Sequence, residues 1–459
     1  MKPNDPRAHL RERLISLLTR GDPVSPSQLA FELGISQPTF SRLVASLRGE
    51  VLSFGRTRNR RYAVAREIPG VRQPLVVYEV RPRGEQPRRF GDLSAVGARG
   101  FYLDNRDGGQ YFEDLPWFLQ DARPSGFLGR LVPRRHPELG LPADIRMWSA
   151  DQALRFASRH GWDPPGAFIV GDEAFSRFLE EVERPSNLVD ATDRPERYPA
   201  IALDLLSFGS AGSSAAGEHP KFLATRREDD RLTPVLVKFS PMTDESVGRR
   251  VADLLVAEQV ALATVGGQGF MVPAASILDS GGRLFLEVER YDRDGISHRT
   301  GQVALEFLDA EFAGTDRIRW AASVEVLAAR GVVPAGEVSR VRWLETFGRL
   351  IGNTDMHFGN LAFLLDGVRV TALAPVYDML PMHYHPRQGE LPRDDHVLPI
   401  LGPQDADVAR SALDAAIEFW SRLTEDSRVS ESFRGIAARN LGRSIELRPS
   451  VDRLPVAAK

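Results

Sequence analysis

Apolar side chains recur at helical spacing in the first fifty residues. Residues 9–18 place four leucines on one face of a predicted helix. A second helix is predicted to begin after Ser25, a residue type that caps helix N-termini, and to end at Gly34. Ser36 is the candidate cap of a third helix, whose apolar residues continue to position 47. Helix, glycine turn and second helix follow one another as in a helix-turn-helix.

The next stretch alternates apolar and polar residues around a basic centre. Residues 51–64, VLSFGRTRNRRYAV, are predicted to form a short hairpin, which makes residues 8–65 a winged helix-turn-helix. In this motif the helix that follows Ser36 would enter the major groove of DNA, and the hairpin would contact the phosphates. The alternative is a small helical module that docks on another protein. The candidate DNA contacts are Gln37, Thr39, Ser41 and Arg42 on the helix, and Arg56, Arg58, Arg60 and Arg61 near the hairpin tip.

The middle of the chain carries weaker patterns. Residues 68–141 are rich in proline and glycine and contain short strand-like runs and a short helix around Trp117, which predicts a small β-rich subdomain. Residues 149–160 and 172–182 are predicted to be helices. None of these segments carries a recognisable set of reactive side chains.

A run of small residues, 205–224, lies between two segments that we interpret as strands. Its glycines allow the backbone to approach a phosphate closely and to direct N–H groups at it. The run lacks the Gly-Lys-Ser/Thr of a Walker A loop, so a flexible surface loop is the alternative. The glycines in question are Gly209, Gly212 and Gly217.

A single lysine, Lys238, interrupts the apolar strand predicted over residues 234–240. A lysine there is costly unless its ammonium reaches a partner, which in kinases is the nucleotide phosphates and a glutamate of the following helix. A snorkelling lysine on an edge strand is the alternative. The predicted helix 246–265 contains the candidate partner Glu258, and Glu245 or Asp253 could replace it.

Residues 281–293, GGRLFLEVERYDR, predict a buried strand that emerges as a charged segment. Such a strand can offer backbone groups to an adenine edge, as a hinge between two lobes does. From residue 301 onward the pattern becomes helical, and the helix predicted over residues 337–351 leads to Asp355.

The strongest pattern for chemistry spans residues 350–378. Asp355 and Asn360 are separated by five positions, and an Asp-Gly pair at 366–367 between two apolar runs predicts a hairpin that returns Asp378 to them. One carboxylate can then act as a base while an Asn and an Asp offer hard oxygen ligands to Mg²⁺. Protein kinases place the same residue types at this spacing.

Three histidines near this segment raise a different chemistry. His357, His383 and His385 could form a transition-metal site, but their spacing fits no familiar ligand pattern. We therefore expect His357 to brace the loop beside Asp355, and we count it with Asp355 and Lys238 among the candidate catalytic residues.

Composition and charge narrow the setting. The chain has no cysteine, which excludes disulfides and thiolate metal sites and fits a reducing compartment. Its start is polar and no long apolar window occurs, so we expect no signal peptide, no membrane contact and a cytoplasmic location. The first 72 residues hold 13 lysines and arginines against 6 acidic residues, although the net charge of the chain is −3. A basic N-terminal segment followed by an acidic remainder indicates that only the N-terminal segment contacts a polyanion.

The ordered motifs resemble the HipA family of serine/threonine kinases, the toxins of bacterial toxin–antitoxin modules. GNTDMHFGN, starting at Gly352, resembles the catalytic motif Asn-x-x-Asp-x-His-x-x-Asn with Asn353 at its first position, although only Thr354 separates Asn353 from Asp355 here. VYDML resembles the metal-binding segment. LEVERYDR resembles the hinge, which implies that Glu289 and Tyr291 face adenine. GSSAAGEHPKF, ending at Lys221 and Phe222, resembles the phosphate loop that carries the autophosphorylated serine. The matching serines are Ser214 and Ser213.

The resemblance implies an α+β, two-lobed, protein-kinase-like fold that uses ATP and Mg²⁺. The implied order is a winged helix-turn-helix (1–68), a β-rich subdomain (69–141), an N-lobe (142–295) and a helical C-lobe (296–459). The resemblance also implies an antitoxin partner, and a winged helix favours a homodimer on DNA. The fused DNA-binding head departs from the usual plan, in which the antitoxin supplies it, and is similar to a YjjJ-like subgroup.

The residues leave three functions open. The first is ATP-dependent phosphotransfer to a serine or threonine of an unnamed protein, with Lys238 on the phosphates, Asp355 as the base, and Asn360 with Asp378 on Mg²⁺. The second is a small-molecule phosphotransferase similar to aminoglycoside or choline kinases, which use related motifs. The third is a DNA-binding regulator whose kinase-like body only senses nucleotide, and a base such as Asp355 argues against it.

Overall fold

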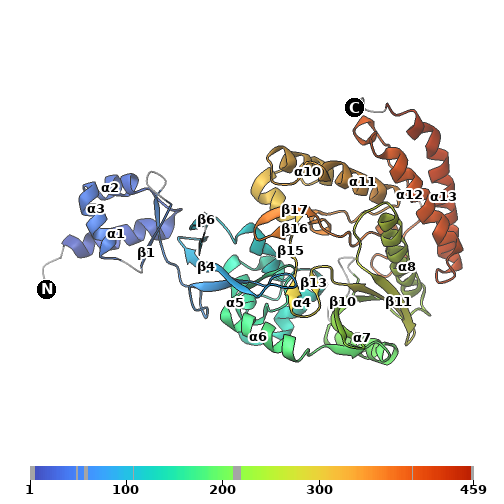
Figure 1. The fold of residues 1–459 in the computed structure, drawn as a ribbon, viewed down its shortest axis with the longest axis horizontal. Coiled ribbons are helices and arrows are strands. Elements are labelled where there is room, and N and C mark those ends of the chain that lie inside the picture. Colours follow the sequence, from blue (N-terminus) through green and yellow to red (C-terminus); the bar gives the residue numbers. More distant parts are fainter. Residues whose placement is uncertain are drawn as a thin grey trace. The chain divides into compact units, whose positions relative to one another are not determined.

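A computed structural model of the chain describes residues 6–47, 50–55, 60–106, 108–209, 219–394 and 396–455 (Figure 1). Backbone contacts divide the chain into two compact bodies. The N-terminal body comprises residues 1–125 and 132–183, and the C-terminal body comprises residues 126–131 and 184–459. Each body has sheets and a core of its own, and the finer division into four domains stays a prediction.

The N-terminal body begins with three helices and a hairpin, in the order that the sequence predicts. Ser25 and Ser36 accept hydrogen bonds from backbone N–H groups of the helices that they precede, and Gly34 adopts a φ of 68° in the turn between them. Leucines of these helices pack with Phe40 and Tyr62 in one buried cluster. The elements are α1 (Pro6–Arg20), α2 (Pro26–Leu33), α3 (Gln37–Ala45), β1 (Val51–Phe54) and β2 (Arg61–Val64).

The rest of this body is a five-stranded antiparallel sheet in the order β6-β5-β4-β3-β7. Helix α6 packs Phe175 and Phe178 against Tyr78 and Ile169 of the sheet. The strands are β3 (Leu75–Glu79), β4 (Arg88–Val96), β5 (Gly100–Asn105), β6 (Gln110–Phe112) and β7 (Phe168–Val170). The helical elements are η2 (Trp117–Ala122), the second part of α4 (Gly126–Arg135), η3 (Pro137–Leu139), η4 (Ile145–Met147), α5 (Ala150–His160) and α6 (Asp172–Glu183). Residues 126–131 of α4 belong to the C-terminal body.

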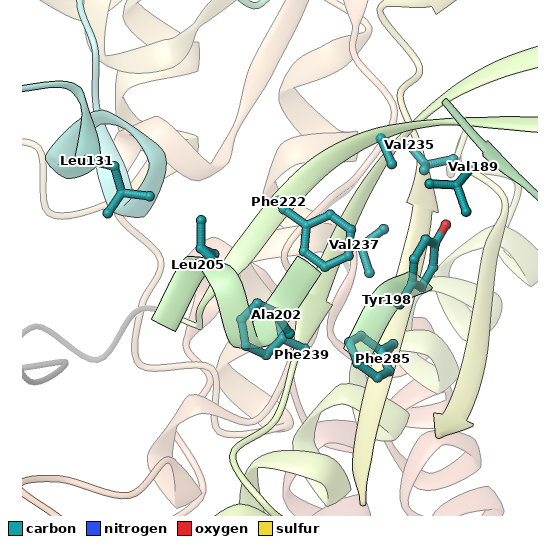
Figure 2. Close-up of a cluster of buried hydrophobic side chains, with 11 residues drawn as sticks. Leu131, Val189, Tyr198, Ala202, Leu205, Phe222, Val235, Val237, Phe239 and Phe285 are labelled. Carbon is teal, nitrogen blue, oxygen red and sulfur yellow. The ribbon is translucent and has the colours of Figure 1, made fainter. Parts of the chain in front are cut away.

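The C-terminal body is built on a second five-stranded sheet, in the order β11-β12-β10-β9-β8. Helices α7 and α8 cover its two faces (Figure 1). On the α7 face, Tyr198, Ala202 and Leu205 pack against Phe222, Val237 and Phe285 of the strands (Figure 2). The elements are β8 (Leu188–Asp190), α7 (Arg194–Gly209), β9 (Lys221–Glu228), β10 (Arg231–Phe239), α8 (Ser246–Gly267), β11 (Ala275–Ser280) and β12 (Arg283–Glu289).

The remaining C-terminal residues form helices around a three-stranded sheet, in the order β15-β16-β17. The predicted Asp-Gly hairpin is confirmed, and Gly367 adopts the positive φ of 58° that its turn requires. The elements are β13 (Arg293–Asp294), β14 (His298–Arg299), β15 (Gly301–Ala304), α9 (Leu305–Leu308), η5 (Asp309–Ala313), α10 (Trp320–Ala329), α11 (Glu337–Leu350), η6 (Phe358–Asn360), β16 (Ala362–Asp366), β17 (Arg369–Leu373), η7 (Met382–Tyr384), η8 (Pro403–Asp405), α12 (Ala409–Glu425) and α13 (Glu431–Asp452).

The fold class is α+β, as expected, and two local expectations are wrong. Residues 301–304, where we expected the helical pattern to begin, form the strand β15. The segment before the small-residue run is the helix α7, where we interpreted a strand. Tyr198, Ala202 and Leu205 recur at helical spacing on its buried side, and this period outweighs the short apolar run Leu205–Leu206. Within the described part of the chain, no helix combines the length and the apolar character that crossing a membrane requires.

Candidate active site

Three charged side chains that are distant in sequence meet at the end of β10. Lys238 Nζ donates to both carboxylate oxygens of Glu258, at 2.7 and 2.9 Å, and to Asp378 Oδ1 at 2.6 Å. Lys238 belongs to the face of the sheet that α8 covers, and Glu258 lies in α8. Lys238 and Glu258 are buried, while the side chain of Asp378 retains 28% of its exposure. The structure thus gives the buried lysine two carboxylate partners.

The electrostatics of this cluster follow from burial opposed by ion pairing. Burial alone would lower the pKa of Lys238, but the charges of Asp378 and Glu258 outweigh it and raise that pKa. Burial likewise works against ionised Asp378, yet the positive charges of Lys238 and Lys221 hold its pKa below the usual range. Burial raises the pKa of Glu258 to about 7, because Lys238 offsets only part of the desolvation. Lys238 and Asp378 are therefore charged at neutral pH.

The segment from Asn353 to Asn360 lies beside the segment that carries Asp378. Asn360 donates its amide N–H to the carbonyl oxygen of Asp355 at 2.8 Å, and Asn353 accepts from the backbone N–H of Asp355 at 3.1 Å. Tyr377 donates its hydroxyl to the carbonyl of Gly359 at 2.7 Å. The bond from Tyr377 joins the two segments, and the other two bonds fix the shape of residues 353–360. Because β16 begins and β17 ends at the same end of their antiparallel pair, Asp355, Asn360 and Asp378 come from segments at one end of the three-stranded sheet.

Asp378 is also distinguished by its backbone. Its φ is +70°, in the left-handed region that non-glycine residues rarely adopt. Such a conformation persists where surrounding contacts fix it and is common at functional sites. Here the ion pair to Lys238 and the bond from the neighbouring Tyr377 hold the residue on both sides.

His219 is a residue of this site that the sequence reasoning missed. It precedes the strand of Lys221, it is buried, and its ring lies 4.8 Å from that of His385. Its Nε2 atom has no hydrogen-bond partner among the described residues. Burial, together with the nearby charges of Lys238 and Lys221, keeps the pKa of His219 well below its ordinary value. Its place beside Pro220 and Lys221 in the phosphate-loop motif was the one available signal.

The two hinge residues lie differently. Tyr291 donates its hydroxyl to Gln302, and its ring lies 6.0 Å from that of Tyr377, next to Asp378. Glu289 belongs to the opposite face of the sheet, where it accepts from Arg226 at 2.8 Å. The structure therefore brings Tyr291, and not the side chain of Glu289, toward the cluster around Lys238.

The middle of the small-residue run, residues 210–218, lies outside the described structure. Gly209 is the last residue of α7, and Lys221 begins β9 with Lys238 as its register partner on β10. The other candidates lie outside the described residues and keep their predicted roles: Gly212, Ser213, Ser214 and Gly217.

His357 lies in the bracing position that we expected. Its Nδ1 accepts from the backbone N–H of Gly359 at 3.0 Å, and its carbonyl accepts from Trp320 Nε1 at 3.1 Å. His383 lies by Tyr384 and His396, while His385 lies by His219. Among the described residues, the three histidines do not form a group that could hold a metal ion.

In the N-terminal body, the candidate DNA contacts are solvent-exposed. Gln37, Thr39, Ser41 and Arg42 share the outer surface of α3, while Phe40 of the same helix is buried. Arg60 and Arg61 are exposed at the start of β2. Arg56 and Arg58 lie outside the described residues. Nothing in these positions tests DNA binding, which stays a prediction.

Similarity to known proteins covers both bodies. Two family models match: a YjjJ-like toxin middle domain over residues 71–179, and a HipA-like C-terminal domain over residues 213–440. Toxin YjjJ of Escherichia coli (strain K12) is 36% identical over 432 residues, which is 92% of this chain and 95% of the relative.

Two solved structures show weaker similarity. A chain from the Shewanella oneidensis MR-1 complex of the toxin–antitoxin system HipA, HipB and its operator DNA has a TM-score of 0.47 at 15% identity, over 82% of this chain and 99% of that one. The Helicobacter pylori proinflammatory kinase CtkA has a TM-score of 0.35 at 14% identity, over 50% of this chain and 97% of that one. Given the two family models and the nearly full-length curated relative, the chain belongs to the HipA family of toxins, in its YjjJ-like subgroup.

Proposed function

We propose that this chain is an ATP- and Mg²⁺-dependent serine/threonine protein kinase. The observation that carries the proposal is the contact of Lys238 with both Glu258 and Asp378. A buried lysine fixed by a glutamate of the next helix is the arrangement by which kinases position nucleotide phosphates. A structural ion pair needs only one carboxylate, whereas the second one here comes from the segment beside Asp355 and Asn360.

Each residue has a proposed part in the reaction. Lys238 and Lys221 attract the phosphates, and Asp355 accepts the proton of the substrate hydroxyl. A bound Mg²⁺ would neutralise charge that develops on the phosphates. The donor set fits that ion, since Asp378 offers a carboxylate and Asn360 directs its N–H at the Asp355 carbonyl, which leaves the amide oxygen as its other polar end. Tyr291 would lie at the adenine side, with the backbone near Glu289.

Autophosphorylation is proposed for Ser214 or Ser213 in the small-residue run. A phosphate adds a charge of about −1.5 to −2 at neutral pH, next to the loop meant to hold the phosphates of ATP. We propose that this modification inhibits the kinase by displacing the loop.

The test is incubation of the purified full-length chain with radiolabelled ATP and Mg²⁺. Label is expected on the chain itself or on an added protein with wild type, and its rate should fall sharply for Asp378→Asn. Asp366→Asn is the matched control, because Asp366 lies in the exposed turn of the Asp-Gly hairpin. Mass mapping then identifies the labelled residue. ATP turnover that responds only to small alcohols, without labelled protein, would instead establish a small-molecule phosphotransferase.

We further propose that the N-terminal helices bind DNA, with α3 in the major groove. The support is the set of exposed polar residues on α3 and the exposed Arg60 and Arg61 near the hairpin tip. Arg42→Ala should weaken binding of a promoter fragment from the chain's own operon, measured by fluorescence anisotropy. Arg146→Ala is the control, because Arg146 is equally exposed and lies outside the three-helix segment. Binding unchanged in Arg42→Ala and in Arg60→Ala would reject this surface.

Family membership supports proposals for partners as well. We propose that an antitoxin-type protein restrains the kinase, that the chain dimerises on DNA, and that it acts in the cytoplasm. Size measurement by light scattering, with and without DNA, tests the dimer directly.

A further inference from the structure

A second group of ionisable side chains lies in the N-terminal body and includes none of the candidate active-site residues. His136 follows the end of α4, Glu138 lies in η3, and His160 is the last residue of α5. One ligand atom from each of the three lies within 4.8 Å of the others. Among the described residues of the chain, it is the one group of three such side chains that could hold a metal ion.

Two of the three distances between ligand atoms match a shared ion. Nδ1 of His136 lies 3.2 Å from Oε1 of Glu138, and Nε2 of His160 lies 3.4 Å from the same oxygen. Zinc bonds of about 2.0–2.1 Å at tetrahedral angles would separate neighbouring ligand atoms by roughly 3.3 Å. Without an ion, His136 Nδ1 and Glu138 Oε1 are within hydrogen-bond distance, and His160 Nε2 approaches the same oxygen at ion-pair distance.

The surroundings hold the ligands in position. The rings of His136 and His160 stack with centroids 3.8 Å apart, so they would have to open away from each other for both nitrogens to point at one tetrahedral ion. Phe156 lies about equally far from both rings, at 6.0 Å. The neighbouring cation, Arg159, is directed elsewhere, since it donates to the carbonyl of Gly70 at 2.7 Å. Both imidazoles are about a third exposed or less, while the side chain of Glu138 is 56% exposed. Solvent can therefore supply the remaining ligand.

We propose that His136, Glu138 and His160 bind one divalent transition-metal ion of the zinc class, with water as the fourth ligand. Two imidazoles and one carboxylate are a zinc donor set, whereas Mg²⁺ prefers oxygen ligands alone. The ion would join the turn after α4 to the C-terminal end of α5 and so stabilise this part of the N-terminal body by its binding free energy. The site is independent of the proposed kinase chemistry.

The test is calorimetric titration of the full-length, chelator-stripped chain with zinc chloride in excess Mg²⁺. Wild type should bind one zinc ion, and its thermal midpoint should rise when zinc is added. His136→Ala and His160→Ala should each abolish this binding and the thermal shift, and Glu138→Gln should weaken binding by at least about tenfold. His9→Ala is the control, because His9 is exposed on α1.

Two further measurements keep the proposal open to refutation if a variant folds poorly. Helical content by circular dichroism identifies such a variant, and Co²⁺ added to wild type should give the visible absorption of a four-coordinate nitrogen and oxygen site. Wild type that binds no zinc, or equal zinc binding in the well-folded histidine variants, would overturn the assignment. So would Co²⁺ bound with the weak absorption of the aqueous ion.

Discussion

The two faces of the β10–β12 sheet each bury a cluster of charges, and the clusters are built in opposite ways. On the α8 face, Lys238 is shared by two carboxylates. On the α7 face, the carboxylate of Glu287 is shared by Tyr198 at 2.6 Å, Arg194 at 3.2 Å, and Arg226. The register of the strands explains the separation, because Lys238 pairs with Leu286 and the side chains of successive residues point to opposite faces.

The origin of the partners distinguishes a structural cluster from a candidate active site. These partners of Glu287 come from α7, which covers this face, and from β9, which belongs to the same sheet as β12. Asp378 comes from a segment 140 residues after Lys238, and it approaches with a strained backbone and a partly exposed side chain. A closed cluster stabilises the fold, whereas a cluster completed by a distant and accessible carboxylate can exchange one partner for a ligand.

The largest effect should come from removing the proposed base. Asp355→Asn should lower the phosphotransfer rate by about 10²- to 10⁴-fold, because the amide cannot accept the proton of the substrate hydroxyl. Unfolding by urea should be nearly unchanged. The measurement is the initial rate of label incorporation, with Asp366→Asn as the control. Full activity in Asp355→Asn would show that the cluster on the α8 face, like the cluster on the α7 face, has no catalytic role.

Glu287→Ala should show the reverse behaviour. It leaves two arginines and a tyrosine hydroxyl without their common acceptor and should destabilise the C-terminal body by about 3–5 kcal/mol. The rate per folded molecule should stay close to wild type, since the cluster lies on the face away from Lys238. Urea unfolding and labelling, measured on the same sample, separate the two effects. A specific loss of rate without a loss of stability would contradict the structural role.

Tyr198→Phe should cost less, because it removes a single hydrogen bond to a charged group. Burial and the charge of Glu287 raise the pKa of Tyr198, so its hydroxyl remains a proton donor throughout the neutral range. Its loss should lower the free energy of unfolding by about 1.5–3 kcal/mol. The midpoint of urea unfolding measures this change, and a midpoint equal to that of wild type would show that the hydroxyl contributes nothing.

Arg231→Ala should have the smallest effect of the series. Arg231 meets Glu289 at 3.5 Å, but its side chain is 70% exposed, and solvent screens such pairs. The expected loss of stability is about 0.5 kcal/mol or less. Urea unfolding measures this loss as well. A loss of stability as large as that of Tyr198→Phe would show that the exposure of an ion pair does not decide how much it contributes.

Local elements were predictable because their signals lie within a few residues. Ser25, Ser36 and Gly34 cap or end their helices as expected, and the Asp-Gly pair makes its hairpin. Asp355 and Asn360 were also predictably close, because only residues 356–359 separate them along the chain. The helix α7 was missed because an apolar run before a glycine-rich segment is equally compatible with a strand.

The amino-acid sequence by itself determined the helices, the hairpins, the family motifs and the residue types of the candidate site. Only the tertiary structure decided which acid reaches Lys238. Asp253 and Glu258 point about 140° apart around α8, and packing turned Glu258 toward the sheet while Asp253 accepts from Ser430 at 2.6 and 2.7 Å. The meeting of His136 and His160 was equally invisible in the sequence. Partners like these depend on how whole elements rotate and pack, and no local pattern encodes that rotation.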